Sequence, residues 1–575
     1  MRITNSIRCP IQFQVTAGSG VGGGGDGRPP SRKPVAVSLP IGTTMIEDCK
    51  DFPEGARLET DLCIVGAGAA GLALASQLAG TRHRVCVIES GGLNYEHRRQ
   101  RLSRGQSVGR PYEALDLCRT RQFGGSTGRT GWGGWCKMLD SADFEHRHWI
   151  PMSGWPVDRK SLLPHYESAA DLLGIKNLLA DEPASAALRT NGPLFSERCF
   201  LSPVPDLGAT LHTRLHTARN VQVILHATAL RLDTDDSGRR VRSIEVASAP
   251  NNRFQVEARF FVLACGGIEN ARLLLVSNRQ MPNGIGNQHD LVGRYFMEHP
   301  RVRWGSLRVS RPDKTVALHV PSVGTRMADL SGPAGGGIND AFGLVLRPEI
   351  RASECLLGSR TWIKPGPCVN DMDGSEALQY LAFWLRKGRL HRDLIKSGRT
   401  IFRHPAGSIS SGIERIWHSR RRARHFHFDT ILEQEPDPES RVTLDTKRDE
   451  FNLPRVKLEW KVGPLVRRTL ERMQTIITEE MRLLGHRSDV QAGTIEIPTG
   501  GEDIPYRWVR HHMGTTRMSN DPRTGVVDSK CQVHGLANLF IAGSSVFPTG
   551  GNDMPTLTIV ALAIKLGQNL QQCLE

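Results

Sequence analysis

Three glycines in the spacing G-x-G-x-x-G constrain the fold of this 575-residue chain more than any other feature. Gly66, Gly68 and Gly71 follow a short apolar strand that ends at Val65, and they open a helix rich in alanine and leucine. Such glycines allow a tight turn that brings the pyrophosphate of a dinucleotide over the helix N-terminus. The next apolar strand ends at Glu89, whose carboxylate can accept hydrogen bonds from both hydroxyls of an adenosine ribose. The sequence therefore predicts a dinucleotide site on a βαβ unit.

The fingerprint alone leaves NAD and FAD open, and the segments around it favour FAD. Glu89 is followed at once by Ser90-Gly91-Gly92. A second glycine-rich loop, residues 123–127, comes later in the chain. A second phosphate or flavin contact is the natural use of such a loop, because its backbone N–H groups can surround an anion.

Apolar strand patterns recur in two later parts of the chain. Residues 221–246 are typical of two alternating strands around a turn, and the run 260–264 leads into a pair of glycines. Residues 538–543 indicate a strand that closes on a glycine, and a long apolar helix from 555 to 574 follows. The simplest architecture is an α/β nucleotide-binding domain assembled from three separated pieces, with a second domain inserted.

These patterns divide the chain as follows. Residues 1–57 contain a glycine-rich run and no helical or strand period, so we expect a disordered N-terminal extension. Residues 58–300 and 501–575 are assigned to the nucleotide-binding domain, with 151–219 partly on the substrate side. Residues 301–500 are assigned to the inserted domain.

Positive charge is concentrated in one part of the chain. The formal net charge is +15, and the segment 386–424 contains twelve Lys or Arg and two acidic residues. This concentration argues against a nucleic-acid-binding protein that presents basic surface throughout. The favoured interpretation is a solvated, arginine-rich insertion. The alternative is a docking face for anionic lipid or an acidic partner, which the interleaved Trp384, Phe402 and Trp417 support slightly.

The cysteines and the apolar runs bear on the compartment. The 12 cysteines are scattered without a C-x-x-C pair, and several lie within apolar strand patterns, where a thiol is usually a small buried hydrophobe. The apolar runs are shorter than the roughly 20 residues of a membrane span, and the N-terminal segment lacks a secretory signal pattern. We expect a cytoplasmic protein with reduced thiols.

Four ordered groups of motifs resemble those of the glucose-methanol-choline (GMC) family of flavin-dependent oxidoreductases, over nearly all of residues 58–575. The groups are residues 65–71 with 89–92; 123–126 with 132–135 and 153–156; 263–272 with 291–294 and 297–300; and 511–518, 525–528, 542–549 and 555–558. The second group is similar to the bacterial sugar and polyol dehydrogenase branch. The resemblance implies a Rossmann-like FAD-binding domain built from discontinuous segments, with an inserted α+β substrate-binding domain of antiparallel sheet and helices.

The resemblance also implies FAD and its contacts. It assigns Gly66, Gly68, Gly71 and Glu89 to the ADP half, Gly125 and Ser126 to the flavin side of the pyrophosphate, Val223 to the strand at the adenine, and Gly543, Ser544, Pro555 and Thr556 to the border of the flavin. Some relatives attach FAD covalently through a histidine after the Gly-Gly-Ser. The loop 125–132 has no histidine, so we expect noncovalent FAD.

Oxidation of an alcohol requires a base near neutral pH while hydride leaves the carbon for flavin N5, and histidine suits that role. The family's His-x-x-Gly-Thr pattern selects His511 as the base, while its neighbour His512 is the less favoured candidate. A second polar residue usually precedes the Pro-Thr by one or two places and hydrogen-bonds the substrate oxygen. Those places hold Met554 and Asp553, and the nearest amide is Asn552. Either the loop is rearranged so that Asn552 takes this role, which is the favoured interpretation, or the enzyme does without such a residue.

The leading hypothesis is an FAD-dependent dehydrogenase or oxidase that acts on a CH–OH group of a sugar, aminocyclitol, polyol or related secondary metabolite. Trp132, Trp135 and His299 are candidate pocket walls. The electron acceptor stays open among oxygen, a quinone and a protein. The alternatives are a nonredox family member, such as a lyase or decarboxylase, and a membrane-associated protein that uses the basic segment. The sequence suggests no metal site and no nucleic-acid partner.

Overall fold

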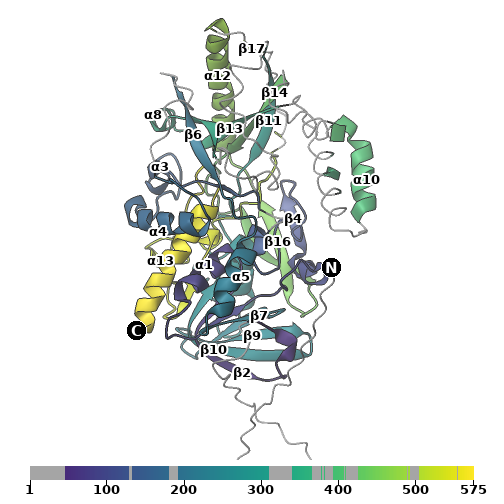
Figure 1. Cartoon of the computed structure of the whole chain (residues 1–575), viewed down its shortest axis with the longest axis vertical. Helices are drawn as coiled ribbons and strands as arrows, with labels where there is room; N and C mark the ends of the chain where they lie inside the picture. Colours follow the sequence, from purple (N-terminus) through teal and green to yellow (C-terminus); the bar gives the residue numbers. More distant parts are fainter. Residues whose placement is uncertain are drawn as a thin grey trace, which may run out of the picture.

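The fold contains two large sheets, one at each end of the molecule (Figure 1). The structure is a computed structural model. It describes residues 46–128, 132–179, 192–309, 340–365, 374, 377–378, 381, 393–406, 408–409, 425–487, 490–492, 504, 506–552 and 554–575.

The first sheet has eight strands and a parallel centre. Its order is β1-β7-β3-β2-β10-β9-β8, and β18 pairs in parallel with β10. The strands are β1 Ile46–Asp48, β2 Arg57–Val65, β3 Val85–Ile88, β7 Val221–Leu225, β8 Thr228–Thr234, β9 Val241–Ala249, β10 Asn252–Leu263 and β18 Leu539–Ile541. Strand β2 ends in a continuous apolar run because it lies in the parallel centre, where helices and loops cover both faces.

Helices drawn from distant parts of the sequence cover this sheet. They are α1 (Ala69–Leu78), α4 (Arg159–Leu172), α5 (Leu207–Thr217), α6 (Gly266–Val276) and α13 (Thr556–Leu574). Helix α1 packs against α13 and α5, and α13 also packs against α4. The first and last parts of the chain therefore complete one layered α/β unit, as the separated sequence patterns predict.

The second sheet has seven strands in the order β17-β11-β14-β13-β12-β6-β5, all paired antiparallel. Its members are β5 Trp135–Cys136, β6 Leu194–Leu201, β11 Arg301–Val309, β12 Asp340–Leu346, β13 Ser359–Pro365, β14 His425–Leu432 and β17 Val490–Ala492. Helix α12 (Pro464–Arg487) packs against β13, β14 and β17. The predicted fold class, a parallel FAD-binding-type sheet with an antiparallel substrate-domain sheet, is confirmed.

A small third sheet joins distant segments. Strands β15 (Arg441–Arg448) and β16 (Pro454–Trp460) form a hairpin, and β4 (Gly105–Gly109) pairs in parallel with β16. Helix α6 contacts both β15 and β16, so this hairpin lies against the FAD-binding side although the sequence places it inside 301–500. The division into domains at residues 300 and 500 stays a prediction.

The expectation of disorder up to residue 57 is wrong for residues 46–57. Strand β1 pairs in parallel with the edge strand β7, in the register Ile46 with Val223. The Asp48 carboxylate also lies 3.0 Å from Nδ1 of His226. Three residues are too short for a visible sequence period, and the strand forms because the neighbouring edge supplies its hydrogen-bond partners. Residues 1–45 lie outside the described residues.

The basic segment 386–424 is described only in part. Helix α10 (Asp393–Arg403) projects from one side of the molecule (Figure 1). Residues 386–392, 407 and 410–424 of this segment lie outside the described residues, and so does the prediction for them. Among the helices that the structure describes, none combines the length and apolarity of a membrane span.

Candidate active site

A cavity of about 370 Å³ lies between the glycine fingerprint and the His511-His512 pair. Nine of the eleven residues predicted to hold FAD line it. They are Gly66, Gly68, Glu89, Gly125, Ser126, Gly543, Ser544, Pro555 and Thr556. His511 and His512 line the same cavity, so the predicted cofactor groups and the predicted base come together in one space.

Two glycine-rich loops meet at the start of the cavity. Gly66 has φ +105°, and a Cβ on it would lie 2.6 Å from the carbonyl oxygen of Ala264. A Cβ on Gly125 would lie 2.9 Å from Cα of Gly68. Gly71 does not line the cavity, and a Cβ on it would lie 1.9 Å from the oxygen of Gly66. At these three positions there is no space for a side chain larger than the hydrogen of glycine. The backbone is therefore exposed at the place where a pyrophosphate binds in this kind of turn.

Glu89 organises this turn. One carboxylate oxygen accepts from the Ala67 N–H at 2.9 Å, and the other accepts from the Gly91 N–H at 2.8 Å. Burial raises the pKa of Glu89, and these N–H donors and nearby Arg121 oppose that shift. Each oxygen keeps a second lone pair, so the carboxylate can still accept hydrogen bonds from ribose hydroxyls.

The cavity wall also holds buried donors from two residues, of which the sequence indicates only Trp132, as a candidate pocket wall, and not Arg119. Nε and Nη1 of Arg119, and Nε1 of Trp132, have no hydrogen-bond partner in the part of the chain that the structure describes. Both residues line the cavity. Buried donors are normally satisfied, so these orphaned groups, with the uncapped N-terminus of α1 at Gly68, fit an anionic, hydrogen-bonding cofactor such as FAD.

A partly buried cluster of one carboxylate and three arginines holds the charges on this wall in place. Arg119 and Arg121 lie 2.8 Å and 2.9 Å from the Glu269 carboxylate, and Arg272 lies 3.3 Å from it. Burial alone would raise the pKa of Glu269, but the neighbouring arginines hold it at about 2. The carboxylate is therefore ionised, and it fixes arginine side chains beside the cavity.

Val223 is fully buried in β7, between β1 and β3, and does not line the cavity. Ala227 and Ala229, which follow β7, line the cavity on this side. A contact between Val223 and adenine stays a prediction. The sequence signal for Val223 was its place on a strand, which cannot tell which residue of the segment faces a ligand.

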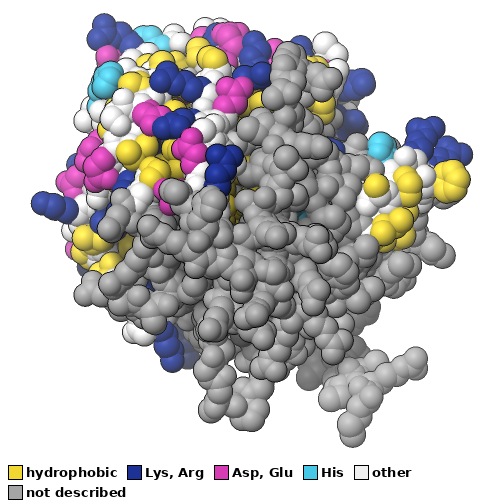
Figure 2. Space-filling view, turned by 90° about the horizontal axis from the view of Figure 1, so that it is seen from above, with side chains coloured by type: hydrophobic (Ala, Val, Ile, Leu, Met, Phe, Trp, Pro, Cys, Tyr) yellow, Lys and Arg dark blue, Asp and Glu magenta, His cyan; other side chains and the backbone are white. Residues whose placement is uncertain are grey.

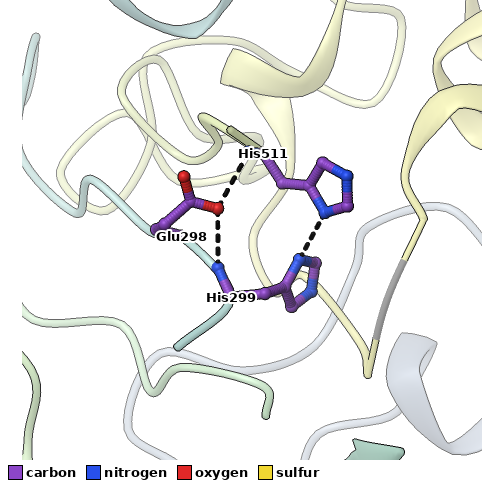
Figure 3. Close-up of side chains that lie close together, drawn as sticks. All are labelled: Glu298, His299 and His511. Carbon is purple, nitrogen blue, oxygen red and sulfur yellow. Dashed lines mark hydrogen bonds between the residues drawn. The ribbon is translucent and has the colours of Figure 1, made fainter. Parts of the chain in front are cut away.

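His511 meets His299 at the far end of the cavity. The two Nδ1 atoms lie 2.9 Å apart, and the two rings are nearly perpendicular at 88° (Figure 3). His299 is fully buried, and its Nε2 lies 3.0 Å from the carbonyl oxygen of Gly551. The sequence indicates His299 only as a candidate pocket wall, whereas the structure places its ring in direct contact with the predicted base.

Glu298 fixes the backbone of both histidines. One oxygen accepts from the N–H groups of His299 and His511, at 2.9 Å and 2.8 Å (Figure 3). The other accepts from the Arg510 N–H at 2.9 Å and from the Tyr112 hydroxyl at 2.7 Å. Burial raises the pKa of Glu298, and these donors oppose the shift. An acceptor with four donors is typical of an ionised carboxylate.

The adjacent residues His511 and His512 are both neutral near pH 7. Burial, together with repulsion from His299 and His512 when these carry charge, holds the pKa of His511 well below its usual value. Burial and nearby Arg119 lower the pKa of His512 to about 3. Nε2 of His512 lies 2.8 Å from the Tyr112 hydroxyl, which connects it to Glu298. A neutral imidazole is the form that can accept a proton.

Asn552 lies in a buried polar network. Its carbonyl oxygen accepts from Lys137 Nζ at 2.8 Å, and its amide donates to Glu197 at 3.1 Å. Lys137 and Glu197 are themselves paired at 2.7 Å, and Arg360 pairs with Glu197. Asn552 does not line the cavity that holds His511. A hydrogen bond from Asn552 to substrate stays a prediction, and Asp553 lies outside the described residues.

Potential ligand atoms of Glu298, His299 and His511 lie within 4.8 Å of one another, as a metal site would require. The contacts fit a hydrogen-bond network better. Both Glu298 oxygens already accept from N–H or O–H groups, and the two imidazole nitrogens are at direct hydrogen-bond distance. The expectation that the chain has no metal site stays a prediction.

Comparison with known proteins identifies the class. A family model described as GMC oxidoreductase matches residues 436–563, and one described as FAD dependent oxidoreductase matches residues 61–293. The second region includes the glycine fingerprint and ends five residues before Glu298, and the first includes the His511 segment. The C-terminal part of the chain, which includes His511, is thus similar to GMC oxidoreductases, and FAD is the cofactor that both family models imply.

Individual relatives are distant. The 2-methyl-1,2-propanediol dehydrogenase of Mycolicibacterium austroafricanum is 26% identical over 64% of this chain, and the match spans 58% of that protein. The 6'''-hydroxyparomomycin C oxidase of Streptomyces lividus is 25% identical, over 88% of this chain and 90% of that protein. The solved structure of a formate oxidase variant from Aspergillus oryzae RIB40 has a TM-score of 0.54 at 17% identity, covering 91% of this chain and 100% of that one, which shows the shared fold alone.

We predict that Gly71→Ala removes bound flavin. The new methyl group would meet the Gly66 oxygen at 1.9 Å, so the fingerprint turn must open, at a cost of about 1–3 kcal/mol for overpacking. The purified variant should lack the visible flavin absorbance and melt at a lower temperature. Gly398→Ala, in helix α10, is the matched control and should keep both properties, because no atom of the described residues lies within 4 Å of its added Cβ. Full flavin content in Gly71→Ala would contradict the proposed close packing.

We predict that His512 makes the protein acid-sensitive. The pKa of His512 is lowered to about 3 in the folded chain. Below about pH 6.5 the unfolded chain therefore binds a proton that the folded chain does not, and the free energy of unfolding falls by about 1.4 kcal/mol per pH unit down to pH 3. In His512→Gln the free energy of unfolding should change less steeply with pH, because up to one fewer proton is taken up on unfolding. Urea unfolding between pH 4 and pH 7 measures both slopes, and equal slopes would disprove the assignment.

Proposed function

We propose that this chain oxidises a CH–OH group of a sugar, aminocyclitol, polyol or related metabolite. The observation that carries the proposal is the position of neutral His511 at the end of the cavity that fits FAD. A substrate carbon placed in that cavity would lie between the cofactor and a base. The names of the two curated relatives, a diol dehydrogenase and a hydroxyparomomycin C oxidase, support hydroxylated substrates.

The chemistry divides between cofactor and protein. FAD, when bound, supplies the acceptor for the hydride that leaves the alcohol carbon. His511 accepts the hydroxyl proton as the C–O bond becomes a carbonyl, so one proton and one hydride leave the substrate. Glu298 holds the His511 backbone, which fixes the position of the base at the cavity.

Finer assignments belong to the same proposal. FAD is bound noncovalently, because the loop 125–132 contains no histidine. Trp132, on the cavity wall, stacks on a sugar or cyclitol ring, which is consistent with the sugar and polyol dehydrogenase branch. The acceptor of the electrons is oxygen, a quinone or a protein. The location is cytoplasmic, as expected from the scattered cysteines.

We predict that one class of alcohol bleaches the flavin and that His511→Ala prevents it. Purified holoenzyme is titrated anaerobically with sugars, aminocyclitols, polyols and aliphatic alcohols, and flavin reduction is followed in the visible spectrum. Loss of the base should slow reduction by about 10²- to 10⁴-fold at saturating substrate. His146→Ala, at an exposed histidine, is the control and should reduce at the wild-type rate.

The same titration decides against the proposal in two cases. A wild type that no alcohol reduces would favour the nonredox alternative, a lyase or decarboxylase. A His511→Ala variant that reduces as fast as wild type would reject His511 as the base. Reoxidation of the reduced enzyme by air or by a soluble quinone then distinguishes the acceptors.

A second candidate function, peripheral contact with an anionic membrane, rests on helix α10. Phe402 is 87% exposed on this helix, and Ile409 beyond it is 61% exposed. Arg399 and Arg403 are exposed beside Phe402. Figure 2 shows hydrophobic and basic side chains together at the right-hand edge of the molecule, where α10 projects in Figure 1. Exposed apolar side chains flanked by arginines suit a surface of anionic lipid.

We predict that the protein sediments with vesicles of phosphatidylserine and phosphatidylcholine but not with phosphatidylcholine alone. Added salt should release it, because the attraction is largely electrostatic. Phe402→Ser combined with Arg403→Glu should reduce binding at least about tenfold, since both the apolar and the charged contribution are lost. Arg82→Glu, on a turn of the FAD-binding side, is the control. Equal sedimentation of both variants with anionic vesicles would reject α10 as the contact.

A further inference from the structure

His299 is placed to control the protonation of His511. It lies in the segment that leads into β11, is fully buried, and its ring contacts groups at both nitrogens. Nε2 faces the Gly551 carbonyl oxygen at 3.0 Å, and Nδ1 faces Nδ1 of His511 at 2.9 Å. Figure 3 shows the His511 ring approaching His299 through one nitrogen while its other nitrogen points away.

The two contacts determine where the protons lie. A carbonyl oxygen only accepts hydrogen bonds, so Nε2 of His299 must carry a proton to donate to Gly551. In the neutral ring the other nitrogen, Nδ1, then has a lone pair and accepts. The nitrogen that faces it, Nδ1 of His511, must therefore carry the proton. Neutral His511 consequently has its lone pair on Nε2.

The opposite arrangement is unfavourable. If His511 accepted at Nδ1, His299 would carry protons on both nitrogens and hold a positive charge in full burial. His511 would then carry its proton on Nε2 and could not act as a base there. The Glu298 carboxylate does not stabilise such a charge on the His299 ring through a hydrogen bond to that ring. Its oxygens accept from the backbone N–H groups of His299, His511 and Arg510 and from the Tyr112 hydroxyl.

We propose that His299 is a positioning residue that holds His511 in the tautomer with the proton on Nδ1, so that Nε2 accepts the substrate proton. The inference rests on the proposed alcohol oxidation for its catalytic consequence. The same hydrogen bond persists after proton transfer, since the His511 imidazolium still donates from Nδ1 to neutral His299. It is then a bond from a charged donor, which is about twice as strong as a neutral one. His299 therefore favours the state that forms during the reaction.

Two substitutions separate this role from packing. His299→Leu fills the space and removes the acceptor, whereas His299→Asn offers an amide oxygen near the position of Nδ1. With the alcohol that reduces the wild type, His299→Leu should lower kcat by about 10- to 100-fold, the range for a hydrogen bond to a charged group, with a KM within about threefold. His299→Asn should recover kcat to within about fivefold of wild type. Flavin content and melting temperature verify that both variants fold.

The tautomer is measured without any substrate. In ¹⁵N-histidine-labelled holoenzyme, the His511 ring should give one protonated Nδ1 and one unprotonated Nε2, assigned by the loss of these signals in His511→Gln. His299→Leu should remove this pattern, and His299→Asn should retain it. An unchanged tautomer in His299→Leu, or wild-type kcat in that variant, would overturn the inference. If no alcohol reduces the flavin but the tautomer depends on His299 as described, the proposed function fails while the control of His511 by His299 stands.

Discussion

The carboxylate of Glu298 is the interaction on which the arrangement of the site depends. It lies where the chain enters the antiparallel sheet, and it accepts from backbone N–H groups of Arg510 and His511, more than 200 residues later in the sequence. A fully buried carboxylate without donors would be unfavourable. The donors therefore stabilise the charge, and in return the charge fixes the spacing of two histidine rings. Rigid placement of this kind is what proton transfer between fixed groups requires.

A similar principle operates on another part of the cavity wall. Glu269 is partly buried and ionised among Arg119, Arg121 and Arg272, and it holds these guanidinium groups at the cavity. Each of the two carboxylates holds its neighbours in place: Glu298 accepts from backbone N–H groups and a hydroxyl, and Glu269 pairs with guanidinium groups.

Much of the cofactor cavity could be predicted from the sequence, because its signals are local. The glycines at 66, 68 and 71 must be close in space because they are close in the chain, and backbone approach explains why no larger residue fits. The partner of His511 could not be predicted in this way. His299 is 212 residues away, and only the pairing of distant segments brings the two rings together. Asn552 shows the converse, since its place in the sequence suggested substrate contact while its side chain bonds Lys137 and Glu197.

The parallel sheet combines β2, β10 and β18, which come from the beginning, middle and end of the chain. The same is true of the cavity, whose walls run from Gly66 to Thr556. The sheet cannot be completed until β18 has left the ribosome, because β18 follows the other strands of this sheet in the sequence. Cofactor binding therefore depends on synthesis of the chain beyond β18. A chain that stops before β18 lacks one strand of the sheet and the later residues that line the cavity, such as Gly543 and Thr556. Such a chain cannot retain the flavin that would stabilise it.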